Sequence, residues 1–140
     1  KVNLLLVVGG DRIGDALIHS LGGRERIRVY RDRSVSLLRI GTLLRRGSLR
    51  ISDLAGMALA EFRRPRRDVS ALVDGEVRTN DDLCEAIART GSQRVLLYRA
   101  ALIVTRKTLE GSAEVLNIHC ATLDGYGGLA AIRRALEEGA

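Results

Sequence analysis

The sequence predicts an α/β protein with a three-layer, Rossmann-like fold around a mostly parallel central sheet. A near-continuous apolar run at Val2–Val8 is typical of a strand that is buried on both faces. A glycine pair and a helical pattern follow it, and strand-like and helix-like segments then alternate along the chain, which favours βαβ units. With 140 residues, 46% of them hydrophobic and 3% aromatic, we expect one domain, residues 1–140, with an aliphatic core.

The first βαβ unit occupies the amino-terminal part of the chain. Gly9-Gly10 ends the first strand, and the apolar spacing within Arg12–Leu21 predicts a helix. Gly22-Gly23 ends this helix, because glycine is the common residue just past a helix end. Ile27–Tyr30 is the expected second strand, and a crossover between parallel strands is almost always right-handed.

The glycine turn also allows a dinucleotide-binding interpretation. Asp32 lies about twenty residues after the turn, where an acid that binds a ribose is expected. However, the pattern from Gly9 to Gly14 lacks the middle glycine of the dinucleotide fingerprint, and Asp11 would place a negative charge near a pyrophosphate. The glycine turn therefore gives only weak support to dinucleotide-dependent redox chemistry.

The middle of the chain is rich in arginine. Apolar residues recur near helical spacing within Arg33–Arg50, and Ser52-Asp53 is the expected cap of a further helix that Pro65 ends. The arginines around Pro65 form either a solvated turn or a loop that contacts anions. Val69–Val73 is the expected third strand, and Asp74-Gly75 is the expected turn after it.

The second half of the chain repeats the alternation of helices and strands. Residues 79–82 supply caps for a helix that Thr90-Gly91 ends, and a fourth strand is expected at Arg94–Tyr98. A short helix at Thr105–Gly111 then returns the chain to a last apolar strand, which ends at Ile118.

Asn117 and His119 lie at the end of this last strand. Residues two apart on a strand share a face, so we expect both side chains in one open cleft, within about 6 Å of each other. A glycine-rich loop and a helical pattern at Leu129–Glu138 follow, and ligands bind outside the carboxyl ends of strands in open α/β sheets. The alternative is an ordinary strand end whose polar groups cap that helix.

The residues around this strand end resemble the signature of formyltransferases that use 10-formyltetrahydrofolate. The family pattern is Asn-x-His-Pro-x-x-Leu-Pro-x-Tyr-x-Gly. The family includes enzymes that act on glycinamide ribonucleotide, methionyl-tRNA and sugar amines. Cys120 and Asp124 stand where the family usually has proline, and the similarity is clearest over 81–140. The matching positions are Asn117-Ile118-His119, Leu123, Tyr126 and Gly128, followed by Ala135-Leu136 and Gly139.

The resemblance implies a formyltransferase fold, formyl transfer from 10-formyltetrahydrofolate to a primary amine, and roles for individual residues. Asn117 would stabilise the oxyanion and His119 would move the proton, both as catalytic groups. The folate-binding loop falls on Tyr98, Arg99, Ala100, Ala101, Leu102 and Ile103, although Tyr98 replaces a usual glycine and Ala101 a usual arginine. The expected contacts with the acceptor substrate are Gly9, Gly10, Tyr126 and Gly128.

The family also uses an aspartate that raises the basicity of the catalytic histidine. That residue belongs to a motif beyond position 140, so we expect the carboxyl-terminal part of the domain to be missing. From the chain as written we expect little or no formyl transfer. The alternatives are a non-catalytic or regulatory nucleotide-binding module with the same fold, or a formyltetrahydrofolate hydrolase in which water is the acceptor.

The net charge and the cysteines narrow the choice of expected partners and of the expected compartment. The net charge is +6, which suits an anionic partner or reflects a bias toward arginine. The resemblance implies a small-molecule amine as the acceptor, and a sugar nucleotide, glycinamide ribonucleotide and methionyl-tRNA are the examples that the family offers. Cys84 and Cys120 lack a metal-ligand spacing and read as free thiols, so we expect a cytoplasmic protein without a metal. No run is long enough to span a membrane, so we expect no membrane partner.

Overall fold

A computed structural model describes residues 4–47, 49–111 and 113–118 of this chain. The expectations for His119, Cys120, Tyr126, Gly128 and the helix at Leu129–Glu138 lie outside the described residues. The chain divides into two compact units, which are described separately below. The first contains Lys1–Val35 and Arg64–Ile118, and the second contains Ser36–Arg63 and His119–Ala140.

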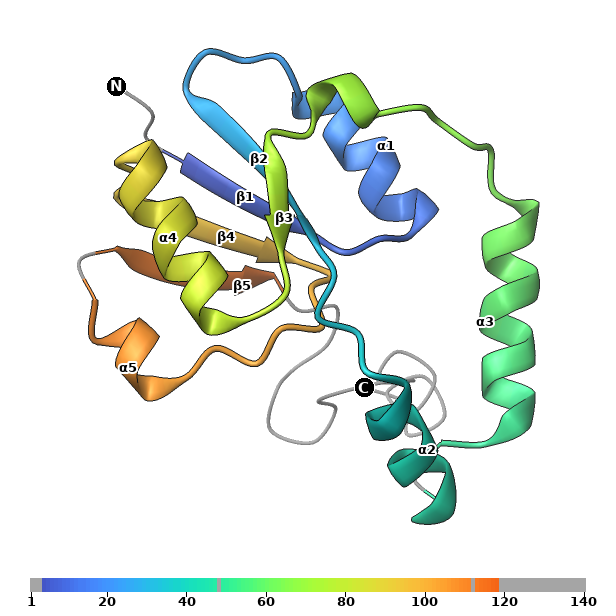
Figure 1. The fold of residues 1–140 in the computed structure, drawn as a ribbon. Helices are drawn as coiled ribbons and strands as arrows, with labels where there is room; N and C mark the ends of the chain where they lie inside the picture. The colour runs from blue at the N-terminus through green and yellow to red at the C-terminus, as the bar shows by residue number, and fades with distance from the viewer. Residues whose placement is uncertain (1–3, 48, 112, 119–140) are drawn as a thin grey trace. The chain divides into compact units, whose positions relative to one another are not determined.

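The first unit is built on a five-stranded sheet in which every pair of neighbouring strands is parallel. The strand order is β3-β2-β1-β4-β5, so the sheet grows outward in both directions from the first strand (Figure 1). The predicted α/β class and Rossmann-like parallel sheet are confirmed. The strands are β1 (Leu4–Val8), β2 (Ile27–Asp32), β3 (Gly75–Val77), β4 (Arg94–Tyr98) and β5 (Glu114–Ile118).

Helices cover both faces of this sheet, and the alternation of side chains along β1 gives each face its own core. Leu5 and Val7 pack on the side of α4 (Asn80–Thr90), together with Leu83 and Val95. The side chains between them point to the other face, where α1 (Arg12–Leu21) packs (Figure 1). The core on that face consists of Leu6, Val8, Ile18, Val29 and Val69. The helix α4, the sheet and the helix α1 thus form the three layers that the sequence predicts.

Local capping fixes the helices where the sequence predicts them. Asp11 caps α1 by accepting a hydrogen bond from the Gly14 N–H at 2.7 Å. At the start of α4, Thr79 and Asp82 form a capping box, and backbone N–H donors of Arg78 and Thr79 hold the pKa of Asp82 below its usual value. A short helix, α5 (Arg106–Leu109), precedes β5 as expected.

The predicted strand at Val69–Val73 is wrong. Ser70–Leu72 forms a single 3₁₀ turn, and β3 lies at Gly75–Val77, where a turn was expected. Asp68 accepts hydrogen bonds from both the backbone N–H and the hydroxyl of Ser70, at 3.0 and 2.7 Å, which starts the turn. The turn lets Val69 enter the core on the α1 face, so burial in a turn explains the apolar pattern that resembled a strand.

The described residues of the second unit form two helices with no buried residue, α2 (Leu37–Arg45) and α3 (Ile51–Arg63). The expected position of the cap at Ser52-Asp53 is wrong, because α3 begins at Ile51 and both residues lie in its first turn. Asp53 still caps the helix start, since its carboxylate accepts a hydrogen bond from the Arg50 N–H at 3.1 Å. The prediction of a single domain over 1–140 stays a prediction.

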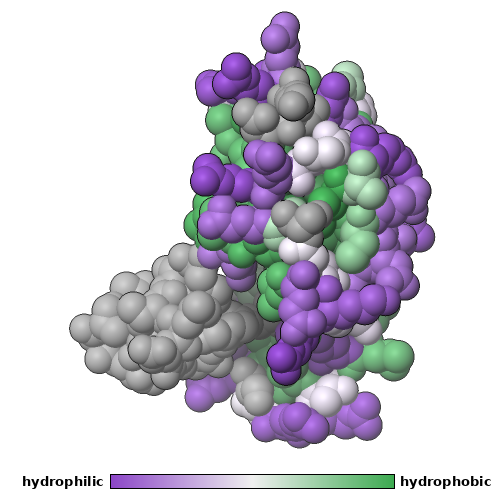
Figure 2. All heavy atoms as spheres, turned by 90° about the vertical axis from the view of Figure 1, so that its left-hand side faces the viewer, coloured by the Kyte–Doolittle hydropathy of each residue, from purple (hydrophilic) through white to green (hydrophobic). Residues whose placement is uncertain are grey.

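Polar side chains dominate the coloured surface in Figure 2, as the aliphatic core and the 29% charged content lead one to expect. Among the described residues, no helix combines the length and the apolar character that crossing a membrane requires.

Candidate functional site

The candidate site lies where β1 and β4 end side by side. Because all strands are parallel, the loops that follow these two strands leave the same edge of the sheet. The strand order reverses between them, and such a switch point is where ligands bind in open α/β sheets. The Gly9 N–H donates to the Tyr98 carbonyl oxygen at 3.0 Å, which joins the first loop to the predicted folate-binding loop, Tyr98–Ile103.

Gly9 and Arg99 approach each other so closely that only glycine fits at position 9. A Cβ added to Gly9 would lie 2.2 Å from the Arg99 carbonyl oxygen, a backbone atom. Arg99 itself has φ of 55°, in the left-handed region that residues other than glycine, asparagine and aspartate seldom adopt. Neighbouring contacts must therefore hold the loop Tyr98–Ile103 in this conformation.

One such contact is the ion pair between Arg99 and Asp11. The Arg99 Nε lies 2.5 Å from the Asp11 carboxylate, and both side chains are partly exposed. The same carboxylate caps α1, so a single aspartate joins the helix start to the loop. Asp11 thus faces an arginine of the protein, and this contact was not predicted from the sequence.

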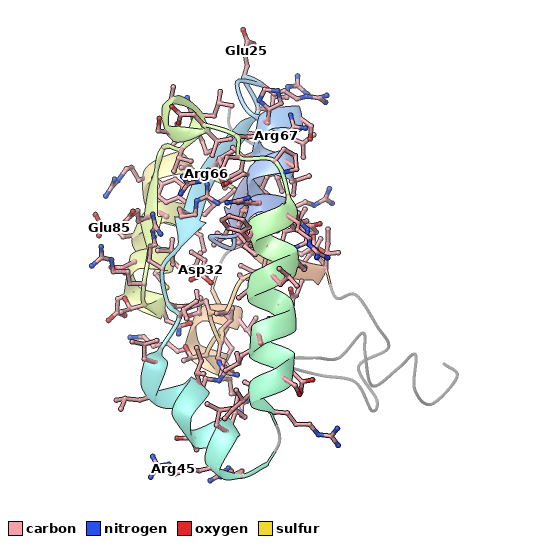
Figure 3. All side chains as sticks on the ribbon, turned by 90° about the vertical axis from the view of Figure 1, so that its right-hand side faces the viewer. Glu25, Asp32, Arg45, Arg66, Arg67 and Glu85 are labelled. Carbon is pink, nitrogen blue, oxygen red and sulfur yellow. The ribbon has the colours of Figure 1, made fainter. Side chains whose placement is uncertain are left out.

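A second contact comes from Asp32 at the end of β2, where Figure 3 labels it. Asp32 is only 2% exposed, and its carboxylate accepts hydrogen bonds from the backbone N–H groups of Ala101 and Leu102 in the loop after β4. It also accepts from the Ser34 N–H at 2.8 Å. The dinucleotide interpretation gave this side chain to a ribose, but the protein's own backbone already occupies it.

Asn80, at the start of α4, holds the far end of the same loop. Its amide nitrogen donates to the Ile103 carbonyl oxygen at 3.0 Å. Its amide oxygen accepts from the Thr105 N–H at 2.9 Å and from the Thr108 hydroxyl at 3.1 Å. The loop is therefore tied at its beginning, middle and end by polar groups from three different elements.

A buried arginine contacts the backbone of the loop that follows β1. Arg31 on β2 donates to the Gly9 carbonyl oxygen at 2.9 Å and pairs with Asp15 of α1 at 2.6 Å. Sequence analysis missed this pair, because a charged residue in a short apolar strand normally marks an exposed position. The sequence carries no local signal for the contact with Gly9, because this contact depends on β1 and β2 being neighbours in the sheet.

Asn117 lies near the end of β5, the neighbour of β4, in register with Leu97. Its side chain shares a face with Val115, which packs against the same core as Ala100 and Leu102 of the loop after β4. The sheet thus brings Asn117 and this loop to one face at adjacent strand ends, and Asn117 is exposed. The expected partner His119 lies outside the described residues.

An open pocket of about 470 Å³ lies between α1, β2, β3 and the segment around the 3₁₀ turn. Of the predicted site residues that the structure describes, none lines this pocket. Its acids are already bonded: Glu76 to Arg33 and Arg78, and Asp74 to Arg28. Arg67, labelled in Figure 3, also lines it. The lining residues are Asp15, Arg31, Arg33, Arg67, Asp68, Val69, Ser70, Val73, Asp74, Gly75 and Glu76.

No protein-family model, no curated protein and no solved structure matches this chain. Within the part of the chain that the structure describes, no three His, Cys, Asp or Glu side chains are grouped as a metal site requires.

Proposed function

We propose that this protein transfers a formyl group from 10-formyltetrahydrofolate to a primary amine. The observation that carries the proposal is the placement of Asn117 beside Tyr98–Ile103, on one face and at adjacent strand ends. The signature-like residues that begin at Asn117 support the same assignment. The proposal requires Asn117 and His119 to act on the formyl group and the loop to hold the folate.

The form of the loop supports the binding of a flat, polar ring. A pterin carries hydrogen-bond donors and acceptors along its edges, and backbone N–H and C=O groups complement such edges when they are held still. Polar contacts from Gly9, Asp32 and Asn80 hold this loop, and its apolar Leu102 packs against the core. A preorganised backbone of this kind binds without a large ordering cost.

The chemistry fits an exposed amide at a strand end. The amine nitrogen attacks the formyl carbon, the carbonyl π electrons move onto oxygen, and the bond from carbon to the folate nitrogen then breaks. Asn117 can donate a hydrogen bond to the oxyanion without competing for the proton. In this proposal His119 takes the proton of the amine and passes it to the leaving nitrogen.

The charge distribution supports an anionic acceptor. Eight arginines and two acids lie between positions 36 and 67, so this segment accounts for the whole net charge of +6. Positive and negative residues elsewhere in the chain are equal in number. An amino-sugar nucleotide, glycinamide ribonucleotide and methionyl-tRNA all carry phosphate that such a segment would attract.

A thermal-shift titration with two ligands tests the proposal. A folate analogue with a formyl group that it cannot transfer should raise the unfolding midpoint by about 5–15 °C at a hundredfold excess over its Kd. NAD should leave the midpoint unchanged, because the backbone of the loop already occupies the Asp32 carboxylate. A shift with NAD and none with the folate analogue would favour the dinucleotide interpretation over formyl transfer.

A further inference from the structure

We propose that Asp32 is a positioning residue that fixes the main chain of Tyr98–Ile103 in its ligand-binding conformation. Its buried carboxylate bonds the N–H groups of Ala101 and Leu102, so these two donors serve the protein and not the ligand. The identity of the ligand rests on the proposed function. The fixing of the loop rests on the contacts alone.

The conformation of the loop explains why it needs such a contact. Arg99 adopts the left-handed region without being glycine, and the unfavourable backbone must be offset by surrounding interactions. The ion pair with Asp11 is partly exposed and therefore weak. The Asp32 carboxylate is buried, and a buried charged acceptor loses much more when its donors move away.

The geometry also explains why an aspartate occupies this position. One carboxylate oxygen accepts from two consecutive N–H groups of the loop, and the other accepts from the Ser34 N–H directly after β2. One charged group thereby ties the end of β2 to the loop that leaves β4, although β1 lies between these two strands. An asparagine would place an amide N–H against a backbone N–H at one of these positions.

The test compares Asp32→Asn with Asp74→Asn by amide hydrogen exchange in the ligand-free chain. Asp74 is a matched control, because it also accepts a backbone N–H, that of Val29 at 2.8 Å, away from the loop. Asp32→Asn should speed exchange at Ala101 and Leu102 by about tenfold or more, while Asp74→Asn should leave both rates as in the original chain. Unchanged rates in Asp32→Asn would overturn the inference.

Binding of the folate analogue provides the functional readout. Asp32→Asn should raise its Kd by about tenfold or more, and Asp74→Asn should not. Faster exchange with an unchanged Kd would overturn the positioning role. If the original chain binds no folate analogue, the proposed function fails, and the exchange rates alone then decide whether Asp32 fixes the loop.

A second variant covers the case in which Asp32→Asn does not fold. Arg99→Ala removes the ion pair with Asp11 but leaves the aspartate free to cap α1. If Asp32 holds the loop, the Ala101 and Leu102 amides should stay protected in Arg99→Ala, because their acceptor is intact. Loss of protection in this variant would show that Arg99 holds the loop and would overturn the inference.

Discussion

Asn117→Ala is expected to lower the small residual rate of formyl transfer of the chain as written by about 10²–10³-fold, the usual cost of removing one oxyanion donor. The side chain is exposed at the end of β5, so its removal should leave the unfolding midpoint unchanged. Formylated amine detected by mass spectrometry measures the rate even when turnover is slow. The panel of acceptors is an amino-sugar nucleotide, glycinamide ribonucleotide and methionyl-tRNA.

Glu114→Gln is the matched control for this variant. Glu114 begins the same strand, is exposed, and pairs with Arg94 at 2.9 Å. Exposed ion pairs contribute little to stability, so the control should retain both the rate and the midpoint of the original chain. Equal rates in Asn117→Ala and in the original chain would exclude Asn117 from the chemistry.

Gly9→Ala is expected to lower the free energy of unfolding by about 1–3 kcal/mol, the usual cost of adding a methyl group at a tightly packed position. The added methyl would lie 2.2 Å from the Arg99 carbonyl oxygen, and a backbone atom cannot rotate away. The chain can relieve the clash only by moving Tyr98–Ile103, so binding of the folate analogue should weaken too. Urea unfolding followed by far-ultraviolet circular dichroism measures the first effect.

Gly56→Ala is the control for the loss of a glycine. Gly56 lies inside α3, and an added Cβ there meets no atom within 4 Å. Alanine should therefore stabilise the chain by about 0.5–1 kcal/mol through its better helix propensity. A Gly9→Ala variant as stable as the original chain would contradict the close approach of the Gly9 backbone to Arg99.

The regular elements were predictable because local chemistry decides them. The helix at Arg12–Leu21 and the strand at Arg94–Tyr98 match their predicted bounds, since a capping side chain or a glycine stands at each helix end and β-branched or aliphatic residues fill the strands. Nearly continuous burial along β1 follows from a strand that is covered on both faces. These features need no knowledge of distant residues.

The errors arise where distant contacts decide the structure. Val69–Val73 has the composition of a strand, but Asp68 starts a turn and Val69 fills space beside α1. Nothing local reveals that Gly75–Val77, which follow Asp74, pair with β2. Gly75 lies so close to the Tyr30 ring that a Cβ there would be 2.7 Å from it, and this neighbour is 45 positions away in the sequence.

The candidate site was predictable in part. The position of Asn117 at a strand end and the loop after β4 follow from the motif and the alternation of elements. The roles of Asp32 and Arg31 could not be predicted, because both depend on which strands become neighbours. Asp32 had a local interpretation as a ribose ligand, and the fold replaces it with contacts to residues about seventy positions away.

A structure of the chain bound to the non-transferable formyl-folate analogue tests the central claim most directly. We expect the pterin against the backbone of Tyr98–Ile103 and the formyl oxygen within hydrogen-bond distance of the Asn117 amide, about 2.7–3.1 Å. Ala101 and Leu102 should still donate to Asp32 in that complex. An analogue seated at Gly9–Gly14 instead, with Asn117 uncontacted, would contradict the account.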